Sequence, residues 1–186
     1  MLSSSEREAI VALIKREVVP AIGCTEPVAV SLCVARATEL LGAKPDSVSV
    51  RLSANILKNA MGVGIPGTGM IGLPIAIALG VLVGRSEYGL EVLKDADEKA
   101  VEAGRRFIEE KRISVQLKEG ITEKLYIEVV VTAAGHYAEA VISGGHTTFV
   151  YLRRDDEVML DERKPSAEQV KEQDEELTLQ RVYEFA

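Results

Sequence analysis

The hydrophobic period of the chain changes near residue 112, and this change limits the fold more than any other feature. Before it, except at the alternating residues 46–53, apolar residues recur every three to four positions or form continuous runs, as in amphipathic and buried helices. After it, β-branched or alternating segments are separated by glycines, which is typical of antiparallel strands. We therefore expect an α+β fold in which buried helices pack on a mainly antiparallel sheet, with a C-terminal connector helix.

The pattern also predicts where the elements lie. Expected helices span residues 3–19, 25–41, 73–83, 88–111 and 166–186, and expected strands span residues 46–53, 113–117, 125–133, 136–143 and 147–153. Ser5 and Glu8 have the spacing of a capping box for the first helix, and Thr25 suits the N-cap of the second. Residues 55–72 are expected to be irregular.

The acidic excess of the chain lies near its C-terminal end. The net charge is −7, yet residues 1–154 carry 18 acidic and 18 basic side chains, whereas residues 155–186 carry 11 acidic and 4 basic. We expect residues 1–154 to form an N-terminal α+β domain and residues 155–186 an acidic linker and connector helix. A body without basic excess, with only 4% aromatic residues, disfavours a nucleic-acid partner.

The sequence predicts a cytoplasmic chain without a membrane partner. Residues 1–19 lack a basic start and a continuous apolar core, and the apolar stretch 61–84 is interrupted by prolines and glycines. Its two cysteines, Cys24 and Cys33, are expected on opposite sides of one helix, about 13 Å apart along its axis, as free thiols. Neither they nor the two histidines suffice for a metal site built from this chain alone.

Residues 23–27, Gly-Cys-Thr-Glu-Pro, are the strongest local candidate for chemistry. They place Cys24 at or just before a helix start, where unpaired amide N–H groups and the helix dipole favour the thiolate. The preceding glycine allows close approach or an unusual dihedral. The alternative is that Cys24 is a small buried residue at a helix cap.

Two further stretches suit recognition of a small carboxylate. Asn55, Lys58 and Asn59 follow a strand and offer amide and ammonium donors, although asparagines also form caps and turns. Residues 62–69, Gly-Val-Gly-Ile-Pro-Gly-Thr-Gly, form a loop whose backbone amides suit an anion, or else a purely structural turn. The glycines match a dinucleotide fingerprint by letter, but no strand precedes them and Pro66 stands where the helix would begin.

Taken together, residues 23–27, 53–59 and 62–69 resemble the N-terminal motifs of the L-cysteine desulfidases, which are relatives of the iron–sulfur L-serine dehydratases and were formerly grouped as an uncharacterised family. The order and spacing of the motifs fit. The resemblance extends through residues 89–93 and 145–147, and covers roughly residues 6–154.

The resemblance implies a lyase that splits L-cysteine into pyruvate, ammonia and hydrogen sulfide with the aid of a [4Fe-4S] cluster. Cys24 matches the cysteine proposed as the base that removes the α-proton. A thiolate at a helix start suits that role. We expect the amino-acid substrate to be contacted by Glu26, Asn55, Lys58, Asn59, Gly67, Thr68, Gly69 and His146.

Members of this family are more than twice as long, and their three cluster-binding cysteines lie in a C-terminal half that resembles the catalytic domain of serine dehydratases. We therefore expect the cluster ligands outside this chain, in a missing C-terminal half or a partner subunit. The chain alone is expected to bind no cluster, to be inactive and to form a homo-oligomer. It would be a piece of the enzyme, a natural split subunit or a free-standing relative. The alternatives are an L-serine dehydratase-like lyase and a non-catalytic amino-acid-binding module.

Overall fold

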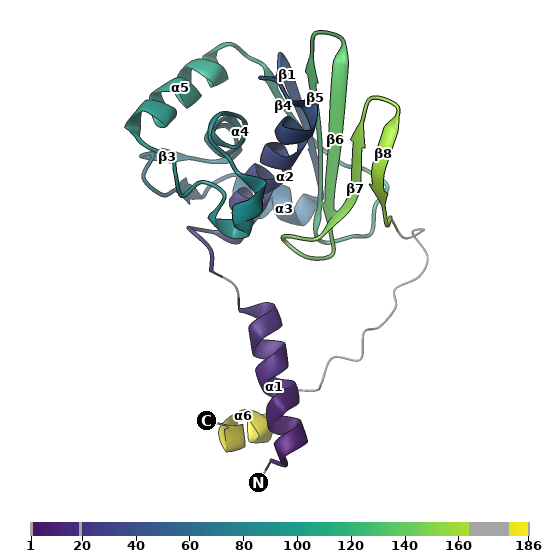
Figure 1. Ribbon diagram of the computed structural model, residues 1–186. Helices are drawn as coiled ribbons and strands as arrows, with labels where there is room; N and C mark the ends of the chain where they lie inside the picture. The colour runs from purple at the N-terminus through teal and green to yellow at the C-terminus, as the bar shows by residue number, and fades with distance from the viewer. Residues whose placement is uncertain (1, 19, 164–178, 186) are drawn as a thin grey trace. The chain divides into compact units, whose positions relative to one another are not determined.

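The computed structural model describes residues 2–18, 20–163 and 179–185 (Figure 1). It divides into two compact units, one containing residues 21–166 and the other residues 1–20 together with residues 167–186. Each unit is described in turn.

The smaller unit contains helix α1 (Ser4–Glu17), which begins with a capping box. The backbone N–H of Ser3 donates to the Glu6 carboxylate at 2.9 Å, and the Ser3 hydroxyl accepts from the Glu6 N–H at 3.3 Å. The sequence placed this box at Ser5 and Glu8, which is wrong. Ser3 has extended backbone angles, as an N-cap requires, whereas Ser5 already lies inside the helix.

The C-terminal helix predicted by the sequence is confirmed in its described part, α6 (Leu179–Phe185). Residues 166–178 of the predicted helix lie outside the described residues. Arg181 pairs with Glu6 of α1 at 3.3 Å, and the Arg7 guanidinium donates to the Glu184 carbonyl at 3.3 Å. These contacts join the first and last helices of the chain.

The larger unit is built on a six-stranded sheet with the order β4-β1-β5-β6-β7-β8. Its strands are β1 (Ser47–Leu52), β4 (Ile113–Leu117), β5 (Tyr126–Ala133), β6 (His136–Ser143), β7 (Phe149–Arg154) and β8 (Glu157–Asp161). The pair β1–β4 is parallel and every other pair is antiparallel. The predicted α+β class and mainly antiparallel sheet are therefore confirmed.

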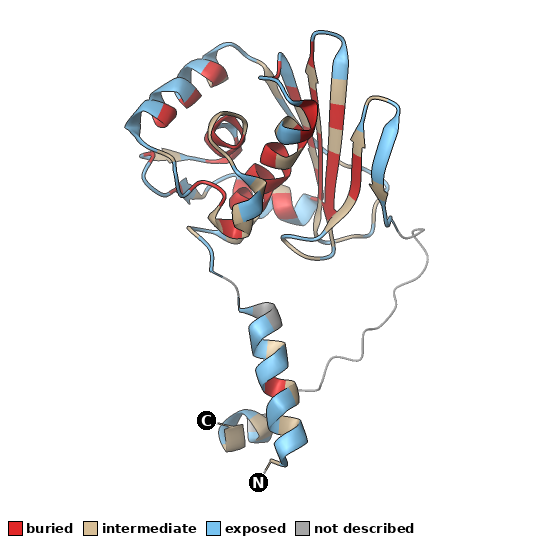
Figure 2. Ribbon diagram, in the orientation of Figure 1, coloured by how far each residue is buried: buried red, intermediate tan, exposed pale blue. Residues whose placement is uncertain are grey.

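Helices cover one face of this sheet. They are α2 (Thr25–Leu41), α3 (Ala54–Ala60), α4 (Leu73–Leu82), the 3-10 helix η1 (Ser86–Glu91) and α5 (Glu98–Glu109). Helix α2 packs on β5 and β6, α4 packs on α2, and α5 packs on α4 (Figure 1). Buried side chains are concentrated in α2, α4 and the central strands (Figure 2). The apolar runs of the sequence thus form the centre of the core.

Helices α2 and α4 approach closely because small residues face each other. The Ser31 hydroxyl donates to the Ala76 carbonyl at 2.9 Å, and a Cβ added at Gly80 would lie 2.8 Å from the Ser31 carbonyl oxygen. A larger side chain at Gly80 would separate the two helices. The contact fixes α2, which carries Cys24 at its start, inside the core.

Two regions differ from the predicted elements. Residues 88–111 do not form one helix, because Gly89 has φ 54° and ψ −127° within η1 and Asp97 has extended backbone angles, φ −106° and ψ 178°. Helix α5 starts anew after Asp97, whose carboxylate accepts from the Ala100 N–H at 2.8 Å. Residues 55–72 are not irregular throughout, because they contain most of α3 and a hairpin of β2 (Gly64–Ile65) and β3 (Met70–Ile71).

The sequence assigned residues 155–165 to a polar linker, but Glu157–Asp161 form strand β8. A tight turn joins β7 to β8, and Asp155 in that turn has φ 48°, a conformation that aspartate tolerates better than most residues. The division between residues 1–154 and 155–186 stays a prediction. In the described ranges, no helix is long and apolar enough to cross a membrane.

Candidate functional site

Cys24 occupies the N-cap of α2, one residue before the position predicted for the cap, which was Thr25. Its carbonyl accepts the first helical hydrogen bond from the Val28 N–H at 3.4 Å. Its thiol is exposed and makes no capping bond of its own. The thiol therefore lies at the positive end of a 17-residue helix and is open to solvent and reagents.

Gly23 brings the Cys24 segment against the glycine loop. It has φ +92°, and a Cβ added to it would lie 2.8 Å from Cγ and 2.9 Å from Cδ of Pro66. Any other residue would be strained by its backbone angle and would collide with the proline ring. Two motifs that lie some forty residues apart in the sequence are therefore in contact.

The glycine loop is a compact turn at the tip of the β2–β3 hairpin. The Thr68 N–H donates to the Ile65 carbonyl at 3.2 Å, and Gly67, with φ +75°, follows Pro66 in the turn. Proline followed by glycine at the two central positions is typical of a type II turn. Gly69 also has a positive φ, of 64°. In a dinucleotide fingerprint the glycines join a strand directly to a helix, whereas here they form a hairpin turn and α4 begins only at Leu73, after β3.

Thr68 lies in this turn with its side chain directed into the hairpin. Its hydroxyl donates to the Ile65 carbonyl at 2.7 Å and accepts from the Met70 N–H at 3.0 Å, and the residue is 5% exposed. Gly67 and Gly69, by contrast, are exposed. The loop thus presents backbone at these two glycines, while Thr68 braces the turn.

Glu26 connects the Cys24 segment to helix α3. Its carboxylate accepts from the Asn59 side-chain amide at 3.2 Å and from the Thr25 hydroxyl at 3.3 Å. Glu26 follows Cys24 by two residues, and these bonds hold its carboxylate against α3. A carboxylate there suits the ammonium group of an amino acid.

Asn55, Lys58 and Asn59 lie on the exposed face of α3, because Ile56 and Ala60 turn the opposite face into the core. Residues three and four apart on a helix are neighbours, so the three polar side chains form one row. The Lys58 ammonium in this row suits a carboxylate.

The start of α3 is fixed by Ser53, which the sequence analysis did not single out for this role. Its hydroxyl donates to the Lys124 carbonyl at 2.8 Å and accepts from the Ile56 N–H at 3.5 Å, and the residue is buried. A serine between an alternating strand and a short polar and apolar segment is a capping signal that would have revealed α3. Pro66 was also missed as a neighbour of Gly23, and no local pattern predicts such a contact.

His146 lies in the turn between β6 and β7, at the same end of the strands as α3. The register aligns Leu52 of β1 with Ile127 of β5 and Ile142 of β6, so β1 and β6 both finish at the same end of the sheet's strands. Two strand spacings separate these two strand ends, or about 10 Å. In the part of the chain that the structure describes, no hydrogen bond or ion pair joins His146 to Cys24, Glu26 or Asn59.

The other histidine and the other cysteine lie elsewhere. His136 begins β6, at the end of that strand opposite the His146 turn, and pairs with Asp155 at 2.8 Å. Cys33 is fully buried in α2, where its thiol donates to the Ala140 carbonyl at 3.3 Å and burial raises its pKa far above the usual range. Cys33 is therefore an inert core residue.

The residues described here do not fit an iron–sulfur cluster. Across residues 2–18, 20–163 and 179–185, no three His, Cys, Asp or Glu side chains lie together as metal ligands would. A cluster held by this chain would need several cysteines, and the chain has two, one of which is buried.

No protein-family model matches the chain. It is 66% identical over 185 residues to a UPF0597 protein of Bacteroides fragilis, covering 100% of this chain and 43% of the relative. It is 63% identical to one of Bacteroides thetaiotaomicron, covering 98% and 42%, and 42% identical to one of Aeromonas hydrophila, covering 95% and 40%.

The chain thus spans less than half the length of these relatives. The identity extends over nearly all of the chain, including residues on both sides of the Cys24 site. Over its whole length, the chain is homologous to part of the UPF0597 proteins.

Proposed function

We propose that this chain supplies the base and the amino-acid-binding groups of an L-cysteine desulfidase, a lyase that releases hydrogen sulfide. One observation carries the proposal: three motifs that are separate in the sequence meet around an exposed thiol at a helix start. Gly23 packs against Pro66, and Glu26 accepts a hydrogen bond from Asn59. A purely structural cap would not require this convergence of charged and amide side chains.

In this proposal the substrate is bound through both its carboxylate and its ammonium group. The Lys58 ammonium, the Asn55 amide and the backbone amides near Gly67 and Gly69 bind the carboxylate. Glu26 binds the ammonium. Opposite charges of this kind are the ordinary means of orienting a zwitterion. Thr68 stabilises the turn, and His146 follows the end of β6, which lies two strand spacings, or about 10 Å, from the end of β1.

The Cys24 thiolate then removes the α-proton. The Cα–H bond breaks, the proton passes to Sγ, and the electron pair forms the Cα–Cβ double bond as the Cβ–S bond breaks. Sulfur leaves with that bond's electron pair as hydrosulfide, which becomes hydrogen sulfide when it takes the proton from the Cys24 thiol, and this restores the Cys24 thiolate. The aminoacrylate tautomerises to an imine, and water converts that imine to pyruvate and ammonia. The Cys24 thiol is exposed at the start of α2, where a bound substrate can reach it.

The [4Fe-4S] cluster implied by the resemblance belongs, in this proposal, to another region or subunit, where it would assist the departing sulfur. The residues of this chain do not provide its ligands. We further propose that the enzyme works in the reducing cytoplasm, that the chain alone is inactive, and that it self-associates. Sedimentation at high protein concentration tests the last point, which a monodisperse monomer would contradict.

The test is anaerobic turnover of L-cysteine by this chain joined to or co-expressed with the sequence that follows it in its genome, after iron and sulfide are restored. We expect sulfide and pyruvate in equal amounts, lost in Cys24→Ser and retained in Cys33→Ala. Release from L-serine instead would indicate a serine dehydratase-like lyase. Binding of either amino acid without turnover would indicate a binding module, and both results would refute the desulfidase proposal.

A second measurement tests the substrate contacts. Lys58→Met removes the ammonium group from the exposed face of α3, so we expect a higher KM for L-cysteine with a smaller change in kcat. Lys99→Met, on the exposed face of α5, is the matched control. Equal effects of the two substitutions would contradict the proposed role of Lys58.

A further inference from the structure

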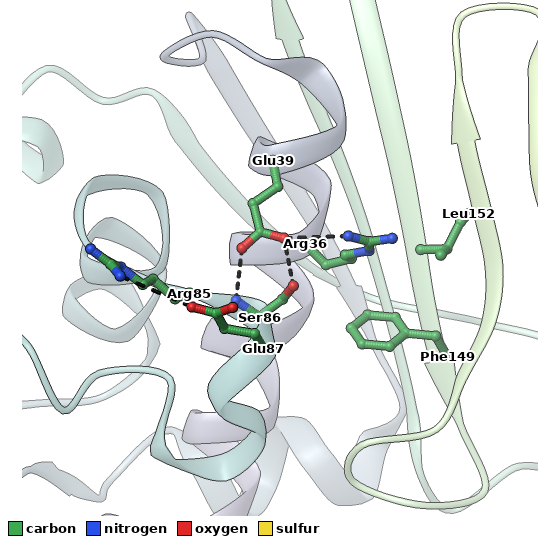
Figure 3. A pocket seen from close by; sticks show the side chains of 7 residues that line it. All are labelled: Arg36, Glu39, Arg85, Ser86, Glu87, Phe149 and Leu152. Carbon is green, nitrogen blue, oxygen red and sulfur yellow. Dashed lines mark hydrogen bonds and ion pairs between the residues drawn. The ribbon is translucent and has the colours of Figure 1, made fainter.

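An open cavity of about 710 Å³ lies between α2, η1 and β7, away from the Cys24 site (Figure 3). Arg36 in its wall is twelve residues beyond Cys24, or about 18 Å along the axis of α2. The cavity is lined by Arg36, Glu39, Arg85, Ser86, Glu87, Phe149 and Leu152. It is a shallow depression that is largely open to solvent.

Arg36 and Arg85 are the two positive groups that line this cavity, and Arg85 is already paired with Asp95 at 3.8 Å and Glu87 at 4.0 Å. The Arg36 guanidinium contacts Glu39 at 3.5 Å and lies between Glu39 and Leu152, near the Phe149 ring (Figure 3). A single long contact uses few of the N–H donors of a guanidinium. The remaining donors suit a carboxylate, which arginine binds through two parallel hydrogen bonds.

Two carboxylates play different roles in the same wall. Glu39 accepts from the Ser86 N–H at 2.7 Å and from the Ser86 hydroxyl at 2.5 Å, so it is fixed to the start of η1. Glu87 has a loose ion pair with Arg85, at 4.0 Å, and its side chain is 69% exposed. Glu87 is therefore the carboxylate that a cationic group can approach.

Phe149 and Leu152 of β7 form an apolar wall beside these charges. A ligand that matches all three features has a carboxylate, an ammonium group and a small side chain. We propose that this cavity is a second site for a free α-amino acid, with its carboxylate on Arg36, its ammonium on Glu87 and its side chain against β7. The proposal goes beyond the function proposed above and does not depend on it.

The cavity is connected to the Cys24 segment through η1. Ser86 opens this helix, and at its other end the Leu90 carbonyl accepts a hydrogen bond from the Ile22 N–H at 3.2 Å, two residues before Cys24. A ligand that binds Glu87 therefore orders the segment on which the Cys24 loop rests. Occupation of the cavity is expected to alter the surroundings of Cys24 without contact.

The experiment is a titration of the full 186-residue chain, labelled with ¹⁵N, with L-serine as the probe. We expect saturable shifts of the amide signals of Arg36, Ser86 and Phe149. N-acetyl-L-serine lacks the ammonium and L-serine methyl ester lacks the carboxylate, so each should bind at least about ten-fold more weakly.

Two substitutions test the named contacts. Arg36→Gln and Glu87→Gln should each weaken binding of L-serine at this site by about ten-fold, whereas Arg105→Gln on the exposed face of α5 should not. Shifts confined to the surroundings of Cys24 and Asn59 would overturn the proposal. So would equal binding of L-serine and its methyl ester, binding of inorganic phosphate as tight as that of L-serine, or no saturable shift at all.

Discussion

Replacing Gly23 by alanine tests the contact that brings the Cys24 segment to the glycine loop. The new Cβ would lie 2.8 Å and 2.9 Å from two carbons of the Pro66 ring, closer than the roughly 3.5 Å that carbon atoms prefer. Neither the ring nor the N-cap backbone can move freely. The variant therefore combines backbone strain with a collision.

Backbone strain and the collision with Pro66 each lower the free energy of unfolding, and their magnitudes can be assigned separately. A side chain at positive φ costs about 1 to 2 kcal/mol, and overpacking against a rigid neighbour costs about 1 to 3 kcal/mol more. Gly67→Ala is the matched control, because Gly67 has φ +75° but nothing within 4 Å of an added Cβ. Alanine narrows the unfolded ensemble alike at both positions, so that effect cancels in the comparison.

The assay is equilibrium unfolding in urea, which gives the free energy of unfolding of each variant. We expect Gly23→Ala to be less stable than Gly67→Ala by about 1 to 3 kcal/mol. Adding Pro66→Ala should recover most of that difference, because it removes the ring. Equal destabilisation by both glycine substitutions, with no recovery on removal of Pro66, would refute the contact and with it the convergence of the motifs.

Three further predictions concern other parts of the larger unit. Ser53→Ala removes a helix cap and the bond to the Lys124 carbonyl, so the free energy of unfolding in urea should fall by about 1 to 2 kcal/mol; an unchanged midpoint would contradict this role. Burial raises the pKa of the Glu139 carboxyl, so the folded state retains its proton at pH values where the unfolded state has lost it, and stability should fall as pH rises above the ordinary glutamate pKa of 4.5. Glu139→Gln should flatten that fall in pH-dependent unfolding curves, and a parallel profile would count against it. In the native chain a thiol reagent should modify Cys24 and leave Cys33 unmodified until denaturant is added, as mass spectrometry of the labelled peptides will reveal; labelling of both thiols at similar rates would show that the core around α2 opens.

Much of the fold follows from hydrophobic periodicity. Strands β4 and β6 have the bounds predicted for them, residues 113–117 and 136–143, because alternation and flanking glycines mark both clearly. Strand β8 was missed because it is a short edge strand among acidic residues, and edge strands bury little. The break at Gly89 was missed because a single glycine within a helical pattern is usually tolerated.

The candidate site was predictable in its parts but not in its arrangement. The position of Cys24 at a helix start follows from the local sequence, although the cap itself was placed one residue late. The bond between Glu26 and Asn59 and the contact between Gly23 and Pro66 depend on tertiary packing. Local patterns carry no information on such distant pairs, so the sequence predicts the three candidate motifs separately but not the contacts between them.

The burial of α2 has a mechanical consequence. This helix is enclosed by the sheet, α4 and η1, and most of its residues from Pro27 to Ala37 are inaccessible to solvent. Close-packed interiors resist deformation, so the thiol at the end of α2 is mounted on the stiffest part of the larger unit. For the proposed substrate, adjustment would then come from the β2–β3 hairpin and the exposed face of α3, and not from movement of the sulfur atom. The position of the Cys24 sulfur atom is therefore fixed when the larger unit folds.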